Sequence, residues 1–236
     1  LLLKPSHLWT SDFDAPRDGF AVLVRGNRIA AVDRADAIGE DARVIDLSGM
    51  TLIPGLMDLH SHLFLHPYNV TAWDDQVLKE SEALRTVRAV RHARDTLDAG
   101  FTLLRDLGTE GAGYADVALK KGIDAGIVPG PRLIVTTRAI VAAGSYAPQR
   151  KNYRPDCCPH QGAEEVSGVD ECVRAVRHQA AHGADWIKLY ADYRVGPNGE
   201  TLPTFSLEEL KAIVDTARDL GRPVAAHSMN DEAMRR

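Results

Sequence analysis

The sequence predicts an α/β protein in which a parallel sheet follows a small N-terminal β unit. Residues 1–50 contain short apolar runs and turn signals, without the 3.6-residue periodicity of a helix. From residue 51 onward, apolar runs alternate with amphipathic segments long enough to form crossover helices. Such alternation is typical of parallel strands joined by right-handed crossovers. We therefore expect two parts, residues 1–50 and residues 51–236.

The N-terminal part reads as a β hairpin with additional strands. Residues 20–25 form an apolar run, Gly26 and Asn27 provide a turn, and residues 28–32 are the expected partner strand. Residues 43–47 form a further short run before a break at Ser48-Gly49. No residue of this part is a candidate for chemistry.

The second part contains five expected strands and the helices between them. In the long helix, Leu84, Val87, Val90 and Leu97 share one face, which we expect to be buried. Ser206 followed by Glu209 is a capping box that starts another helix. The expected strands are residues 52–62, 101–108, 131–136, 184–190 and 223–227, and the expected helices are residues 78–99, 114–125, 169–181 and 206–220, with a fifth starting near residue 231.

Two loops interrupt this rhythm. Residues 143–169 are polar and rich in Gly, Pro and Tyr, and they are more numerous than a packing connection needs. We interpret them as a lid or specificity loop. Residues 193–203 form a second loop, expected at the same end of the sheet.

Bulk properties exclude several classes of protein. A formal net charge of −5 and a pI near 6.0 give no reason to expect nucleic acid or an acidic membrane surface as a partner. No apolar run is long enough to span a bilayer. Three cysteines, an odd number, argue against a disulfide framework. The adjacent pair Cys157-Cys158 would chelate a single tetrahedral ion poorly. A cytoplasmic location is the default expectation.

His60 and His62 are the first candidates for chemistry. They follow an apolar run that Pro54-Gly55 introduces. Side chains at positions i and i+2 of a strand face the same way, so both imidazoles are directed to one point. Neutral imidazoles suit a borderline-soft divalent ion such as zinc.

Lys188 and His227 occupy the ends of two later strands. In a closed barrel of parallel strands these ends would meet His60 and His62 at one mouth. Lys188 stands within the apolar segment Trp-Ile-Lys-Leu-Tyr, where a cation needs a partner. Its amine either reaches the rim or pairs with a carboxylate, or it has taken up carbon dioxide to form an anionic carbamate that bridges two metal ions. Residue types alone leave these readings open.

Three segments carry a resemblance to a known family. Ile53-Pro54-Gly55 with the following Met-Asp-Leu-His-Ser-His, then Gly-Ala-Asp-Trp-Ile-Lys ending at Lys188, then Val-Ala-Ala-His-Ser around His227 resemble the amidohydrolase superfamily. The resemblance implies a distorted (β/α)8 barrel of the TIM type, preceded by part of a small β-sandwich. It also implies a centre of two divalent ions, zinc being the expected metal. His60 and His62 would bind the buried ion, carboxylated Lys188 would bridge both ions, and His227 would bind the exposed one.

The sequence departs from the family pattern after the fifth strand. The family places a further histidine on the sixth strand and an aspartate on the eighth, and neither lies within these residues. An eight-stranded barrel takes about 250 residues by itself, so about five β/α units are present. We expect the remainder of the barrel to be supplied by further chain, and this part alone to be inactive.

The function implied by the resemblance is metal-dependent hydrolysis of an amide or peptide bond. The partner would be a small-molecule amide, such as a dipeptide or an N-acyl amino acid, as in the imidazolonepropionase-related branch, which includes dipeptidases called prolidases. Tyr190 shares the inward face with Lys188 and could donate to the oxyanion or line the rim. Arg194 could bind a substrate carboxylate. The alternatives are a cyclic-amide hydrolase, a non-catalytic scaffold, and a Schiff-base aldolase using Lys188. A homo-oligomer is compatible with the sequence.

Overall fold

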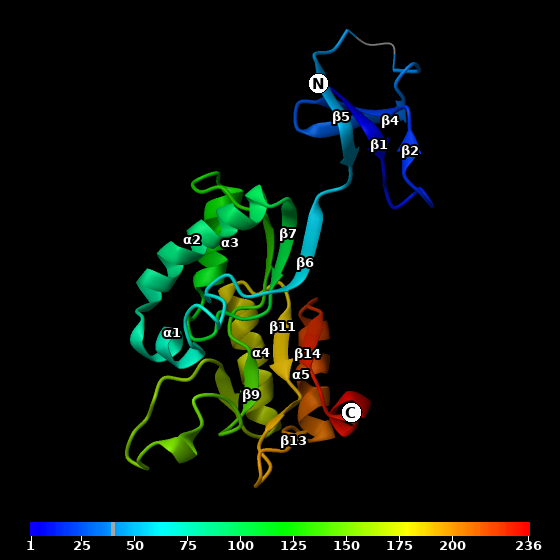
Figure 1. Ribbon diagram of the computed structural model, residues 1–236. Helices are drawn as coiled ribbons and strands as arrows, with labels where there is room; N and C mark the ends of the chain where they lie inside the picture. Colours follow the sequence, from blue (N-terminus) through cyan, green and yellow to red (C-terminus); the bar gives the residue numbers. More distant parts are fainter. Residues whose placement is uncertain (39–40) are drawn as a thin grey trace. The chain divides into compact units, whose positions relative to one another are not determined.

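The computed structural model describes residues 1–38 and 41–236 (Figure 1). The chain divides into two compact units, Leu1–Gly55 and Leu56–Arg236. Residues 39 and 40, which fall within the predicted N-terminal part, lie outside the described residues.

The first unit is a five-stranded sheet. Its strands are β1 (Leu2–Leu8), β2 (Arg17–Asp18), β3 (Phe20–Arg25), β4 (Arg28–Arg34) and β5 (Val44–Leu52). The predicted hairpin is confirmed, because β3 and β4 pair antiparallel with Val22 opposite Val32. Gly26 turns the chain with a φ of 59°, which glycine adopts without steric cost. β5 runs parallel to β1.

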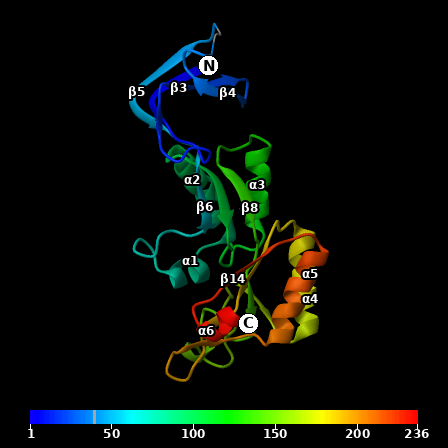
Figure 2. The ribbon, with the colours of Figure 1, turned by 90° about the vertical axis from the view of Figure 1, so that its right-hand side faces the viewer.

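The second unit contains two parallel sheets. One has the order β6-β7-β8, and the other has the order β10-β9-β11-β14. Helices pack against these sheets (Figures 1 and 2). The strands are β6 (Leu56–Ser61), β7 (Phe101–Asp106), β8 (Arg132–Val135), β9 (Ile140–Ala142), β10 (Glu164–Val166), β11 (Ile187–Tyr190) and β14 (Val224–His227).

Most predicted elements of this unit are confirmed within a few residues. The capping box is present, because Ser206 accepts the Glu209 N–H while the Glu209 side chain accepts the Ser206 N–H. Gly183 follows the helix α4 (Val169–His182) and ends it in the left-handed conformation, at a φ of 105°. The helices concerned are α3 (Ala115–Asp124), α4 (Val169–His182), α5 (Leu207–Asp219) and α6 (Asp231–Arg235).

The helix expected over residues 78–99 is two helices, α1 (Trp73–Lys79) and α2 (Glu82–Asp98). Ser81 begins α2 by accepting the Leu84 N–H. The predicted buried face was wrong at Leu84 and Val87, which are 50% and 70% exposed. The residues that face the sheet are spaced by four, namely Arg85, Ala89 and Ala93. Small alanines allow the helix to lie close to the strands, so bulkier residues are directed elsewhere.

The two segments predicted as loops contain short elements of regular secondary structure. Residues 143–169 include the short helix η1 (Arg150–Asn152) and strand β10, which extends the sheet beside β9. The loop expected at residues 193–203 is an antiparallel hairpin of β12 (Asp192–Arg194) and β13 (Thr201–Pro203).

The core lies between the strands and the helices and fixes which strand residues face away from it. Ile187 and Leu189 of β11 are buried in the cluster that contains Ile213 of α5. Because side chains alternate along a strand, Lys188 and Tyr190 project from the opposite face of the sheet. The same alternation places Ala225 and His227 of β14 beside them, since Lys188 pairs with Ala225 and Tyr190 with His227.

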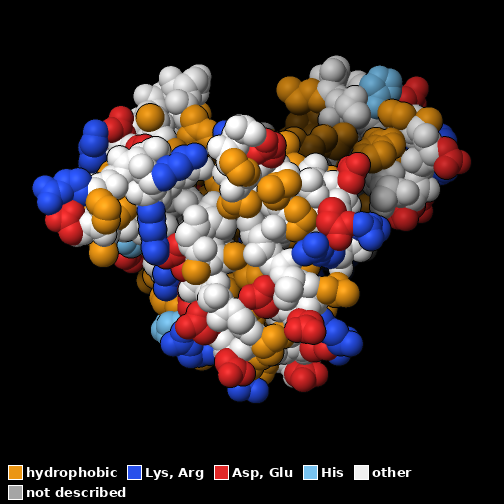
Figure 3. Space-filling view, turned by 90° about the horizontal axis from the view of Figure 1, so that it is seen from below, with side chains coloured by type: hydrophobic (Ala, Val, Ile, Leu, Met, Phe, Trp, Pro, Cys, Tyr) orange, Lys and Arg blue, Asp and Glu red, His pale blue; other side chains and the backbone are white. Residues whose placement is uncertain are grey.

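Among the described residues, no helix has the length and apolar character needed to cross a bilayer. Acidic and basic side chains are interspersed on the face seen in Figure 3. This distribution agrees with the modest formal net charge of −5.

A buried carboxyl group in this fold predicts a dependence of stability on pH. Asp116 is fully buried, and burial raises its pKa from 3.8 to about 7. Its stabilising contribution is complete below pH 3.8 and is lost as the pH rises through about 7, because the unfolded chain ionises more readily. We expect the free energy of unfolding to fall by up to about 1.4 kcal/mol per pH unit across this range.

Urea unfolding of Asp116→Asn between pH 4 and pH 8 should give a shallower slope than the wild type. Asp124→Asn, at the exposed end of the same helix, is the matched control and should keep the wild-type slope. Equal slopes for wild type and Asp116→Asn would contradict the assignment.

Candidate active site

His60 lies near the end of β6, and His62 follows the final residue of that strand and lines a hollow with Leu65 and Tyr68 that does not include His60. The ring centroids of the two histidines are 5.4 Å apart. Burial lowers the pKa of His60, and the positive charge of Lys188 lowers it further. Both effects favour the neutral imidazole, which is the form that binds a metal.

A backbone contact orients His62. Its Nδ1 lies 3.0 Å from the carbonyl oxygen of Gly108. A carbonyl oxygen can only accept, so Nδ1 carries the proton and Nε2 keeps its lone pair. Asp106 holds this turn, because its carboxylate accepts the N–H groups of Leu63 and Gly108. This arrangement is typical of metal-binding histidines, whose second nitrogen is held by a neighbouring acceptor.

Lys188 is buried in β11, with 2% of its surface exposed. The pKa of its amine is lowered to about 8, chiefly by burial and also by the charge of Arg105, while Glu110 opposes the shift. The Nζ atom lies 5.0 Å from the centroid of the Tyr190 ring. Within the described part of the chain, Nζ has neither a hydrogen bond nor an ion pair. A buried amine without a partner is unfavourable in its charged form.

His227 ends β14 directly opposite Tyr190. The two rings stack with centroids 4.7 Å apart. Burial and the charge of Lys188 lower the pKa of His227, while Asp192 opposes this shift. His60, Lys188 and His227 line a common pocket of about 460 Å³, here called the histidine pocket. Its other lining residues are Arg105, Leu107, Trp186, Val224, Ala225, Ala226 and Ser228.

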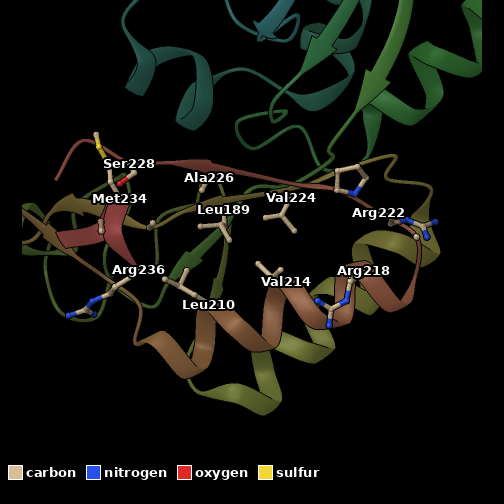
Figure 4. Close-up of a pocket in the computed structure, with 14 residues that line it drawn as sticks. Leu189, Leu210, Val214, Arg218, Arg222, Val224, Ala226, Ser228, Met234 and Arg236 are labelled. Atoms are coloured by element: carbon tan, nitrogen blue, oxygen red, sulfur yellow. The ribbon is translucent and has the colours of Figure 1, made fainter. Parts of the chain in front are cut away.

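A larger hollow of about 740 Å³ lies on the other side of β14. Leu189 and Val224 from the strands and Leu210 and Val214 from α5 point into it (Figure 4). Among its lining residues in the described chain there is no histidine, cysteine or carboxylate. Its size exceeds that of the histidine pocket, but its side chains offer no acid, base or metal ligand.

Glu110 is a buried carboxylate that contacts Tyr190 and acts on the charge of Lys188, and no pattern in the sequence singled it out. Its Oε2 accepts hydrogen bonds from Trp73 Nε1 at 3.0 Å and from the Tyr146 hydroxyl at 2.7 Å. The Tyr190 hydroxyl lies 3.4 Å from Oε1. Burial and the negative charge of Glu110 raise the pKa values of both tyrosines, so both remain protonated donors. The long loop therefore contributes Tyr146 to the surroundings of Tyr190.

The structure places Arg194 away from the histidine pocket. Arg194 is exposed on β12 and lines a separate hollow of about 160 Å³ with Arg150 and Lys151. Its predicted contact with a substrate carboxylate stays a prediction. The Tyr190 ring lies 5.0 Å from Lys188 Nζ and 4.7 Å from the His227 ring, between centroids. Its predicted role toward the oxyanion stays a prediction.

The donor groups present fit a metal centre in part. Within the described residues, no group of three or more His, Cys, Asp or Glu side chains is arranged to hold an ion. The set formed by His60, His62 and His227 requires Lys188 as a fourth donor, and an amine becomes an anionic oxygen donor only as a carbamate. The unprotonated Nε2 of His62 is suited to bind a metal ion. The Lys188 amine, which is partly neutral, is suited to form the carbamate.

Comparison with known proteins adds an independent finding. The sequence profile described as the amidohydrolase family matches residues 51–235. Ochratoxinase from Aspergillus niger is 31% identical over 202 residues, which cover 75% of this chain and 38% of ochratoxinase. The chain spans about two fifths of the length of the curated relatives it matches.

Solved structures share the same arrangement. A crystallised amidohydrolase superposes with a TM-score of 0.80 at 34% identity, covering 99% of this chain and 57% of its own. An Xaa-Pro dipeptidase with methionine in its active site superposes with a TM-score of 0.85 at 28% identity, covering 99% of this chain and 58% of its own. These likenesses identify the second unit as a partial, TIM-barrel-like α/β fold.

Proposed function

The chain belongs to the amidohydrolase family, and from this premise we propose that the protein is a metal-dependent hydrolase of an amide or peptide bond. The substrate class we propose is a dipeptide or an N-acyl amino acid. The observation that carries the proposal is the convergence of His60, Lys188 and His227 on one pocket from three separate strands.

His60, His62, carboxylated Lys188 and His227 would hold two divalent ions, zinc being the expected metal. When bound, these ions supply a nucleophilic hydroxide near neutral pH and polarise the carbonyl group of the substrate. The carbamate forms when the neutral Lys188 amine attacks the carbon of carbon dioxide and the nitrogen loses a proton. The lowered pKa of Lys188, about 8, increases the fraction of amine available for that addition.

Tyr190 is suited to stabilise the oxyanion. Its hydroxyl remains protonated and lies 3.3 Å from the Tyr146 hydroxyl. Its acceptor, Glu110 Oε1, is 3.4 Å away, which is long for an O–H···O contact. The hydroxyl can therefore turn toward a substrate oxygen at little cost. Tyr146 donates to Glu110 Oε2 and keeps that carboxylate anchored while Tyr190 does so.

A similar protein supports the proposed substrate class. It is an Xaa-Pro dipeptidase, and its name indicates a linear dipeptide as substrate. A short segment is also similar to a dihydroorotase, at 49% identity over 45 residues. That match covers 18% of the chain, so it carries less weight than the relatives that match over most of it.

A substrate panel with metal analysis tests the proposal. The protein at its natural length is assayed with Xaa-Pro dipeptides, other dipeptides, N-acyl amino acids and cyclic ureides, and metal is counted by elemental analysis. We expect about two equivalents of metal per chain. We also expect the protein to hydrolyse a linear amide, and a chelator to abolish this activity. If the protein hydrolysed only cyclic ureides, the proposed substrate class would be wrong. If the protein contained no metal and had no activity, a non-catalytic scaffold would be supported instead.

A further inference from the structure

We propose that Asp192 is the positioning residue for His227, holding the imidazole so that Nδ1 is the nitrogen presented to the metal. This inference rests on the proposed function and concerns a residue outside the predicted ligand set. Asp192 begins β12, two residues after Tyr190 and four after Lys188.

Asp192 is fully buried, and its two oxygens have different roles. Oδ2 accepts hydrogen bonds from the Met229 N–H at 2.6 Å, the Asn230 N–H at 2.7 Å and the Ser228 hydroxyl at 3.1 Å. This oxygen therefore caps the turn that follows β14. Oδ1 has no hydrogen-bond partner, although it too is buried.

The unpartnered oxygen is directed at His227. Asp192 Oδ1 lies 3.7 Å from His227 Nε2, slightly beyond hydrogen-bond distance. A buried carboxylate oxygen without a donor is costly, and a small rotation of the imidazole would bring the two atoms into contact. Stacking on Tyr190 keeps the ring close to this orientation.

The contact determines which nitrogen of His227 is free. A carboxylate accepts but does not donate, so Nε2 must carry the proton. Nδ1 then keeps its lone pair, on the side of the ring away from Asp192. Ion-binding histidines commonly have their other nitrogen held by a carboxylate, and loss of that partner typically weakens metal binding about 10-fold to 100-fold.

A role limited to capping the turn would leave Oδ1 unexplained, and the two roles can be separated. Asp192→Asn keeps an oxygen to accept the N–H groups of Met229 and Asn230 but places an NH₂ donor toward His227. That donor favours the tautomer with the proton on Nδ1, which blocks the nitrogen needed by the metal. Asp185→Asn is the matched control, since Asp185 also accepts a backbone N–H, from Val135, but pairs with Lys120.

The experiment measures zinc affinity by competition with a chromophoric chelator, using the protein at its natural length, and unfolding is followed in parallel. We expect Asp192→Asn to weaken one of two zinc equivalents about 10-fold to 100-fold, with the fold retained, while Asp185→Asn binds both as the wild type does. Two tightly bound equivalents in both wild type and Asp192→Asn would overturn the inference but leave the proposed function standing. A wild type that binds no zinc would instead overturn the proposed function.

A second readout distinguishes positioning from a structural effect. The nitrogen chemical shifts of His227 in the metal-free protein report the tautomer directly. We expect the proton on Nε2 in the wild type and on Nδ1 in Asp192→Asn. An unchanged tautomer in the variant would refute the positioning role even if metal binding were weakened.

Discussion

Replacing Lys188 by alanine is expected to remove nearly all hydrolytic activity and most of the bound metal. In the proposed site, the carbamate on this lysine would supply anionic oxygen donors to the ions, which alanine cannot supply. Loss of roughly 4 kcal/mol of transition-state stabilisation corresponds to a decrease in kcat/KM of about 10³-fold. The measurements are steady-state kinetics and metal content.

Restoring the activity of Lys188→Ala with a small carboxylic acid would show that the carbamate, and not merely the lysine side chain, is needed. Lys188→Ala leaves a buried space on the pocket side of β11, into which a small carboxylic acid such as formate or acetate can diffuse. Because the acid supplies the two oxygens that the carbamate supplied, millimolar concentrations should restore part of the activity and the second metal equivalent. Neutral formamide should restore neither.

Lys211→Ala, on the exposed face of α5, is the control for loss of a lysine without loss of the site. It should retain activity and metal. Full activity in Lys188→Ala without added acid would exclude a carbamate from the reaction. A borohydride-trapped adduct at Lys188 with a carbonyl compound would instead favour the aldolase alternative.

Sequence patterns predicted the parts of the site that depend on strand alternation. Lys188 and Tyr190 share one side of β11, because the side-chain period of a strand is two. His60 in β6 and His62 just beyond its end have ring centroids 5.4 Å apart, although His62 does not line the pocket that contains His60. Asp192 lies beyond the end of β11, in β12, so the alternation along β11 does not reach it. Its partners Met229 and Asn230 are distant in sequence, and no local pattern pointed to them.

Other features were beyond the reach of local patterns because they depend on contacts between distant segments. Glu110 lies in a turn, and its partners are Trp73, Tyr146 and Tyr190, which are 36 to 80 residues away in sequence. Nothing local distinguishes this glutamate from a solvated one. The same limit explains α2, where hydrophobic periodicity selected Leu84 and Val87, while the loops after β6 and β7 bury a charged residue of this helix.

Arg85 is that buried charge, and removing it should cause the largest loss of stability. Its side chain is 1% exposed and donates to three backbone carbonyl oxygens, those of Phe64 at 3.1 Å, Thr109 at 2.9 Å and Glu110 at 2.7 Å. These carbonyls belong to the connections that follow β6 and β7, so one guanidinium joins both connections. Glu110 has a φ of 50°, a conformation that a residue with a side chain adopts at a cost and that such contacts maintain.

We therefore expect Arg85→Ala to lower the free energy of unfolding by about 3–5 kcal/mol, because the carbonyl oxygens of Phe64 and Glu110 lose their donor and that of Thr109 keeps only the Ala112 N–H. Arg85→Lys keeps the charge but lacks the planar fork of donors, so it should be intermediate. Arg91→Ala, on the exposed face of the same helix, removes a surface pair with Asp95 and should change stability by less than about 1 kcal/mol. The measurement is urea unfolding at pH 7. A loss in Arg85→Ala as small as that in Arg91→Ala would mean that water satisfies these carbonyls, and that the two connections are held by other contacts.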